Sequence, residues 1–191
     1  MAFRTKFAPI GLTPGDSATL SGKFSLDNTY AGSSAYLGWS WAHIGLYNSN
    51  GNAGTLEGTA FTGGSQNGYT GYTMIITTST SGTGSPWGSG PLGAIGARLK
   101  GNTTAWTGQT GAYGLGGAFQ SPENSGVGKG SFDFTIKVTR LSSYLSRVDY
   151  HLQNEEGTSA YLLEGTVYDT GVNADGTTST LSFDTVGINS S

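Results

Sequence analysis

Residues 131–140, SFDFTIKVTR, limit most strongly what this chain can fold into. Apolar and polar side chains take alternate positions along the whole segment, the apolar ones being Phe132, Phe134, Ile136 and Val138. A period of two places successive side chains on opposite faces of an extended strand. The segment therefore predicts a β-strand with one face on a core and a second face, carrying Asp133, Thr135 and Lys137, directed outward.

Residues 147–154 repeat this alternation and predict the partner of that strand in a hairpin. The apolar positions are Val148, Tyr150 and Leu152, and the polar positions are Asp149, His151 and Gln153. Directly opposite residues of paired strands share a face of the sheet. We therefore expect Lys137, Asp149, His151 and Gln153 to lie on an outward, polar surface.

Other short segments are also rich in β-forming residues, and turns of Gly, Asn, Ser and Pro separate them. Glycine accounts for 33 of the 191 residues, and no segment has a sustained helical period. The sequence predicts one all-β domain over residues 1–191, a two-sheet antiparallel β-sandwich or jelly roll of about nine to eleven strands. The further expected strands are 17–26, 35–47, 69–80, 94–100, 161–168 and 180–188.

Composition excludes several classes of function. The nine Lys and Arg residues are scattered and the net charge is −3, so no nucleic-acid partner is expected. No apolar run approaches the length of a membrane span. Without cysteine the chain has no disulfide, zinc–thiolate site or thiol nucleophile. The N-terminal residues lack the apolar region of a signal peptide, so export would require a signal absent from this sequence.

Residues 35–50, AYLGWSWAHIGLYNSN, have two differently composed faces. Ala42, Ile44 and Leu46 are suited to a core, whereas the opposite face carries Trp39, Trp41, His43 and Tyr47. Indole and phenol rings stack on the apolar faces of sugars. The pattern favours a carbohydrate-binding face, which Trp87 and Trp106 could complete from loops. The alternative is that a second sheet or a loop covers this face and makes the rings part of a core.

Catalytic patterns are weak in this chain. Glycosidases of this architecture need two carboxylates about 5–10 Å apart, and no alternating acidic set occurs. The only histidines, His43 and His151, are candidates for the base of a polysaccharide lyase. Each could equally serve to hydrogen-bond a neighbouring loop.

One loop has the residue types of a calcium site. Asp169, Asn173 and Asp175 supply oxygen atoms in a segment that ends in glycine, which suits a hard cation. The same residues are typical of an ordinary tight turn. No other cofactor is expected.

A resemblance rests on five stretches: KFAPIGLTPGDSATLSGKFSL, WAHIGLYNSNG, GYTGYTMIITTSTSG, SFDFTIKVTR and TLSFDTVGI. In their order they resemble the concanavalin A-like (laminin-G-like) jelly-roll domain of bacterial exported, PEP-CTERM-type surface proteins. The resemblance implies a sandwich fold and an extracellular or cell-surface location.

These observations lead to three alternative functions. We expect non-catalytic binding of a glycan or polysaccharide through the Trp39–Tyr47 face, helped by Asp149, His151 and Gln153. The second possibility is a structural subunit that self-associates into a fibre, sheath or surface layer, with residues 2–12 as a donated strand. The third is a polysaccharide lyase or hydrolase that uses His43 or His151.

Overall fold

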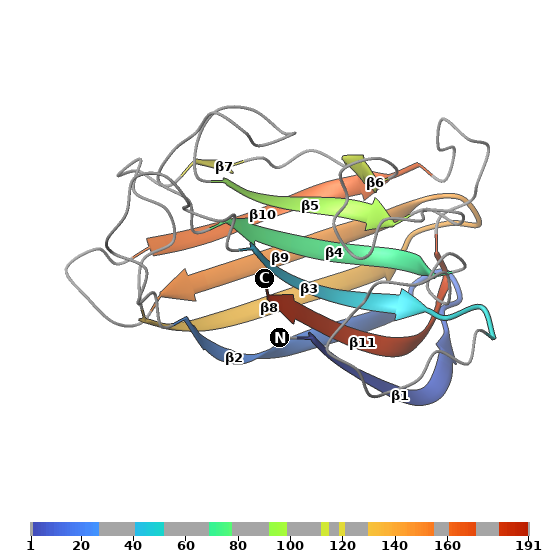
Figure 1. Cartoon of the computed structure of the whole chain (residues 1–191). Helices are drawn as coiled ribbons and strands as arrows, with labels where there is room; N and C mark the ends of the chain where they lie inside the picture. The colour runs from blue at the N-terminus through green and yellow to red at the C-terminus, as the bar shows by residue number, and fades with distance from the viewer. Residues whose placement is uncertain are drawn as a thin grey trace.

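The computed structural model is an all-β sandwich of two antiparallel sheets, as the sequence predicts (Figure 1). It describes residues 2–26, 41–51, 69–77, 92–98, 112–114, 119–120, 130–154, 161–170 and 180–190. Within these ranges there is no helix, and hence none that could cross a membrane.

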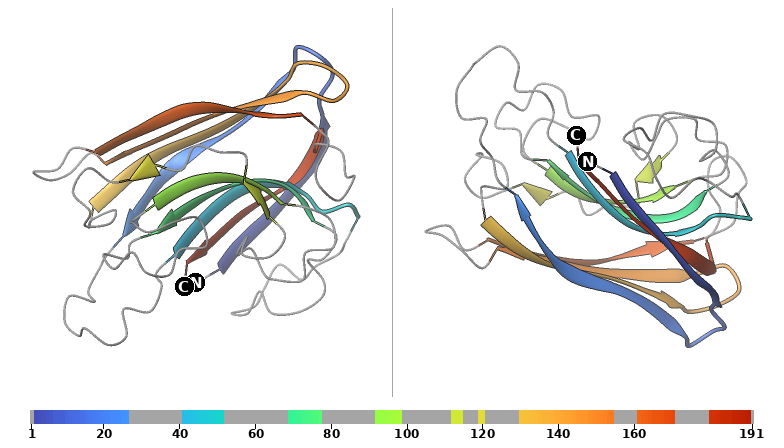
Figure 2. Two further views of the ribbon diagram at one scale, coloured as in Figure 1. Left: turned by 90° about the horizontal axis from the view of Figure 1, so that it is seen from above. Right: turned by 60° about the horizontal axis from the view of Figure 1, so that its bottom comes forward.

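The larger of the two sheets, called the large sheet, contains seven of the described strands. Its first strand β1 (Ala2–Gly11) lies beside its last strand β11 (Ser182–Ser190), so the two ends of the chain are adjacent (Figure 2). The order continues through β3 (Trp41–Asn48), β4 (Thr70–Thr77), β5 (Leu92–Arg98) and β6 (Ala112–Gly114), with β7 (Phe119–Gln120) also on β5.

The other sheet, called the small sheet, has four described strands and lies face to face with the large one (Figure 2). Its order is β10 (Tyr161–Asp169), β9 (Ser146–Asn154), β8 (Gly130–Arg140) and β2 (Ser17–Leu26). The predicted hairpin of 131–140 with 147–154 is confirmed, and its register runs without a shift from Phe132↔Asn154 to Arg140↔Ser146.

Two details of the strand pattern differ from the sequence analysis. Neither β6 nor β7 was predicted, because segments of three and two residues are too short for an alternation to appear. Residues 2–12, considered above as a strand for donation to another subunit, form β1 at the edge of the chain's own large sheet.

The core lies between the two sheets and contains the apolar faces read from the sequence. The alternate positions of β8 and β9 predicted to point inward are buried, and so are Ile44 and Leu46 of β3. Strand β4 adds Tyr72 and Met74, and β11 adds Phe183, whose ring centroid lies 6.1 Å from that of Tyr72.

Glycines at two places in the sheets make room for tyrosine rings. A Cβ on Gly45 would fall 2.1 Å from the hydroxyl oxygen of Tyr47, and one on Gly165 would fall 2.2 Å from that of Tyr150. Gly71 has a φ of +151° and sits against the backbone of β3, where an added Cβ would lie 2.3 Å from the carbonyl oxygen of Leu46. Part of the high glycine content thus serves close packing inside strands as well as turns.

The β1–β2 turn and the β8–β9 turn lie side by side at one end of the sandwich (Figure 2). Gly15 N–H donates to the carbonyl of Arg140 at 2.8 Å, and Arg140 N–H donates to that of Asp16 at 3.0 Å. The side-chain hydroxyl and the backbone N–H of Thr13 both donate to the Asp16 carboxylate, which lowers its pKa. These bonds fix the turn through which the chain passes from the large sheet to the small one.

Asp184 of β11 holds the end of β3. Its carboxylate accepts the Ser49 N–H at 2.7 Å, the Ser49 hydroxyl at 2.5 Å and the Thr185 hydroxyl at 2.8 Å. Partial burial alone would raise the pKa of Asp184, but these donors and the charge of Lys6 together lower it below its usual value.

Replacement of Gly71 by alanine should destabilise the fold by about 2–4 kcal/mol, because the new methyl group meets backbone atoms and L-residues disfavour positive φ. Gly11→Ala is the matched control, since nothing lies within 4 Å of its added Cβ, and should change stability by less than about 0.5 kcal/mol. Denaturant unfolding measures both. Equal effects of the two substitutions would contradict the close approach at Gly71.

Asp184 should make the fold sensitive to acid. Because its folded pKa lies below the unfolded value of 3.8, its stabilisation is present above about pH 4 and is lost as the pH falls through the folded pKa. Asp184→Asn should therefore flatten the acid limb of a stability–pH curve measured by thermal unfolding. An unchanged acid limb would show that another group controls it.

Candidate functional site

The outward side of the small sheet is a continuous polar surface, here called the polar face. It follows from the alternation of four adjacent strands, because their inward positions are taken by the core. The strand registers align its residues in rows across the sheet. Two central rows are Glu164, His151, Thr135 and Ser21, and Thr166, Asp149, Lys137 and Thr19.

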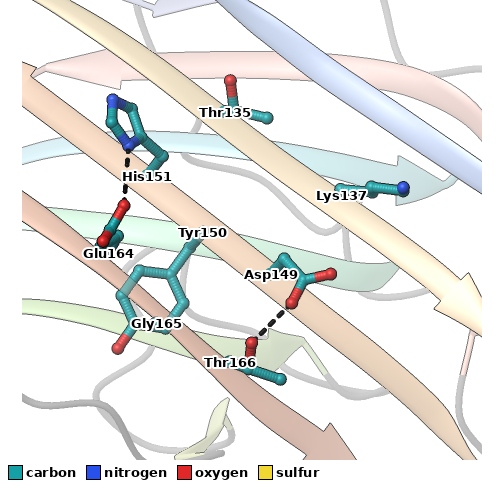
Figure 3. Close-up of a pocket in the computed structure, with 8 residues that line it drawn as sticks. All are labelled: Thr135, Lys137, Asp149, Tyr150, His151, Glu164, Gly165 and Thr166. Atoms are coloured by element: carbon teal, nitrogen blue, oxygen red, sulfur yellow. Dashed lines mark hydrogen bonds and ion pairs between the residues drawn. The ribbon is translucent and has the colours of Figure 1, made fainter.

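A hollow of about 490 Å³ lies on this face where β8, β9 and β10 meet (Figure 3). It brings together three of the residues predicted as ligand-binding, Lys137, Asp149 and His151. Gln153 is exposed on the same face, one row beyond His151. The hollow is lined by Thr135, Lys137, Asp149, Tyr150, His151, Glu164, Gly165 and Thr166.

Asp149 is the best-held polar group of the hollow. Its Oδ1 accepts the Nε–H of Arg147 at 2.8 Å. It also accepts the hydroxyl of Thr166 at 2.6 Å (Figure 3). The hydrogen bond from Arg147, reinforced by the opposite charge, raises the pKa of the guanidinium. A carboxylate held from two strands has a defined direction, although the Arg147 side chain remains half exposed.

The remaining ionisable groups of the hollow differ in their pairing. His151 Nδ1 lies 3.7 Å from Glu164 Oε2 across the β9–β10 pair (Figure 3). Lys137 makes no hydrogen bond or ion pair within the described part of the chain, and its amine points away from His151 and Glu164 (Figure 3). The hollow therefore offers one unengaged cation beside groups that are already paired.

The described residues of the polar face carry balanced formal charge. Lys23, Lys137 and Arg147 contribute three positive charges, and Asp133, Asp149 and Glu164 contribute three negative ones. Lys23 pairs with Asp133 at 3.1 Å, and Arg147 pairs with Asp149. The face thus combines many donors and acceptors with no net charge.

The aromatic face predicted on residues 35–50 is described only in part. Trp39, Trp87 and Trp106 lie outside the described residues, and for Trp41 and His43 only the backbone in β3 is described. Tyr47 was expected on an open face but is wholly buried, and its ring lies over Gly45 and Gly71. The ligand roles of the three tryptophans, Trp41 and His43 stay predictions.

The sheet assignment also separates two groups that the sequence reading joined. Strand β3 belongs to the large sheet, whereas Lys137, Asp149 and His151 belong to the small sheet. The outer faces of a two-sheet sandwich point away from each other. The outward residues of β3 and the polar face therefore cannot contact one ligand ring together.

The predicted calcium loop is corrected at its described member. Asp169 is the last residue of β10, is 1% exposed and points into the core, where it accepts the hydroxyl of Tyr72 at 2.8 Å. Burial first, and then the charge of Asp169, raises the pKa of Tyr72. Asn173 and Asp175 lie outside the described residues. Among the residues that the structure describes, no three acidic or histidine side chains are grouped so that they could hold a metal ion.

Three residues at the site, Arg147, Glu164 and Thr166, were not predicted from the sequence. A signal was present, because YLLEGTVYD alternates Leu163, Gly165 and Val167 with polar positions. The same alternation would have placed Asp169 on the inward side.

Comparison of the chain with protein-family models, with curated proteins and with solved structures finds no match.

Loss of the Asp169 carboxylate should weaken the sandwich. Asp169→Ala should cost about 2 kcal/mol of unfolding free energy, because it leaves the Tyr72 hydroxyl without this partner between the sheets. Glu164→Ala is the control on the same strand, and its exposed carboxylate should matter by less than about 0.5 kcal/mol. If both variants unfold at the same denaturant concentration, the inter-sheet hydrogen bond does not stabilise the fold.

Proposed function

We propose that this domain binds a glycan through the polar face of the small sheet, without catalysing a reaction, at the cell surface or outside the cell. The observation that carries the proposal is the hollow of about 490 Å³, in which side chains of three neighbouring strands converge. Sugar hydroxyls both donate and accept hydrogen bonds, so a surface that combines carboxylate, guanidinium and hydroxyl groups suits them. This places the proposed site on the small sheet, away from the aromatic strand.

The exposure and hydrogen bonding of the two carboxylates in the hollow favour binding over hydrolysis. A general acid needs a carboxyl group whose protonated form is favoured by burial. Here the Asp149 side chain is 27% exposed and holds two hydrogen bonds, and that of Glu164 is 68% exposed. Neither carboxylate is enclosed in an apolar environment of that kind, and both are placed to hydrogen-bond a ligand.

A lyase reading of His151 is weaker for a similar geometric reason. Jelly-roll lyases combine the base with a second group, such as a tyrosine hydroxyl, near the sugar carboxylate. No tyrosine hydroxyl on the described polar face lies in the row of His151. The site therefore supports recognition better than chemistry.

Asp149→Ala should weaken retention on polysaccharide gels by about tenfold, because it removes the group that orients both Arg147 and Thr166. The gels would contain xylan, galactomannan, mixed-linkage glucan or polygalacturonate. Asp133→Ala is the matched control, since Asp133 is also ion-paired on the polar face but does not line the hollow. Equal retention of both variants would show that the hollow is not the binding site.

The same preparations separate the rival functions. Incubation of the protein with each polysaccharide should release no reducing ends and no unsaturated uronate, and gel filtration should give no large assemblies. Release of either product would replace the binding proposal with an enzyme. Filaments or large assemblies with no retention on any gel would instead support a structural subunit.

A further inference from the structure

Tyr168 is an exposed aromatic residue on the polar face. It lies near the end of β10, points outward with Glu164 and Thr166, and is 54% exposed. It follows Thr166 by two residues on one face of the strand, which corresponds to about 7 Å. The ring therefore borders the hollow without lining it.

The partner strand fixes polar groups next to this ring. Tyr168 is directly opposite Arg147, and Thr166 is directly opposite Asp149. Arg147 donates to Asp149 at 2.8 Å, and Thr166 donates to the same oxygen at 2.6 Å. Since Cβ atoms of opposite residues lie about 5 Å apart, the phenol ring stands beside a guanidinium whose direction is set by a carboxylate.

This juxtaposition matches the two chemical sides of a pyranose ring. The C–H bonds of a sugar form an apolar face that packs on an aromatic ring. Its hydroxyl groups, at the ring edge, can accept from the remaining N–H groups of Arg147 and donate to the carboxylate of Asp149. One sugar unit can use both sides only where ring and polar groups adjoin, as they do between β9 and β10.

The balanced charge of the face narrows the class of sugar. With three positive and three negative formal charges, the described polar face gives an acidic polysaccharide no net attraction, and only Lys137 among its cations has no partner there. A neutral sugar needs no such attraction, and its binding depends little on screening by salt.

We propose that Tyr168, with Arg147 and Asp149, forms a stacking subsite for a neutral pyranose unit of the bound glycan. The subsite rests on the proposed glycan binding and adds both a residue and a ligand class to it. The hollow beside Thr166 then receives the neighbouring sugar of the same chain.

The test uses titration calorimetry of the whole protein with cellohexaose, mannohexaose, xylohexaose and, as the acidic probe, hexagalacturonate. The wild-type protein should bind at least one neutral hexaose, with an affinity that changes less than about twofold between low and high salt. Tyr168→Ala should weaken that binding by about tenfold, and Tyr168→Phe should retain it, because the phenylalanine keeps the ring face.

Tyr144→Ala is the matched control, because Tyr144 is 65% exposed but lies in the β8–β9 turn outside the strand rows of the polar face. It should leave the affinity unchanged, and all variants should keep the melting temperature of the wild-type protein. A Tyr168→Ala variant that binds like Tyr144→Ala, while Asp149→Ala loses binding, would overturn the subsite and leave the proposed function standing.

Two further outcomes separate the proposals from each other. Binding of hexagalacturonate alone, with a steep loss at high salt, would overturn the neutral ligand class while supporting glycan binding. No binding of any probe by the wild-type protein, together with no retention on the polysaccharide gels, would overturn the proposed function and the subsite with it.

Discussion

The unbroken antiparallel register of β8 with β9 is the constraint on which the fold and the site both depend. Each inward pair, such as Ile136 with Tyr150, has an outward neighbour pair, such as Lys137 with Asp149. A slip of one residue would move every buried side chain to the outer face. Because burial of the apolar residues opposes that slip, the core fixes the positions of the polar groups that form the hollow. The site is thus a direct consequence of core packing rather than of an added loop.

Contacts at other places hold the two layers in this arrangement. The Tyr72–Asp169 hydrogen bond connects β4 of the large sheet with β10 of the small one, in a region from which water is largely excluded. Within each sheet, a tyrosine ring lies over a glycine, Tyr47 over Gly45 and Tyr150 over Gly165, and fills the space that a side chain would otherwise occupy. Each contact needs a particular small or polar residue, so replacement of that residue should destabilise the fold. The outer face of the small sheet is freer of such demands and can be shaped for a ligand.

The sequence predicted local alternation well and long-range placement poorly. The faces of residues 131–140 and 147–154 were readable, because side-chain period depends only on local geometry. The sheet to which β3 belongs was not readable, since pairing partners depend on contacts between distant segments. Tyr47 shows the limit most clearly: its position in the alternation pointed outward, yet its ring is buried against glycines of β3 and β4. Asp169 was misplaced because its acidic side chain and the turn residues after it suggested a loop.

The central claim is that a neutral glycan lies on the outer face of the small sheet. The most direct test is a titration of isotope-labelled protein with the neutral hexaose that it binds most tightly, followed by backbone amide chemical shifts in nuclear magnetic resonance spectra. Binding at the polar face should change the shifts of residues 135–137, 147–151 and 164–168, with little change in β3 and β4. Changes confined to β3 and β4 would contradict it and would return the site to the strand that carries Trp41 and His43.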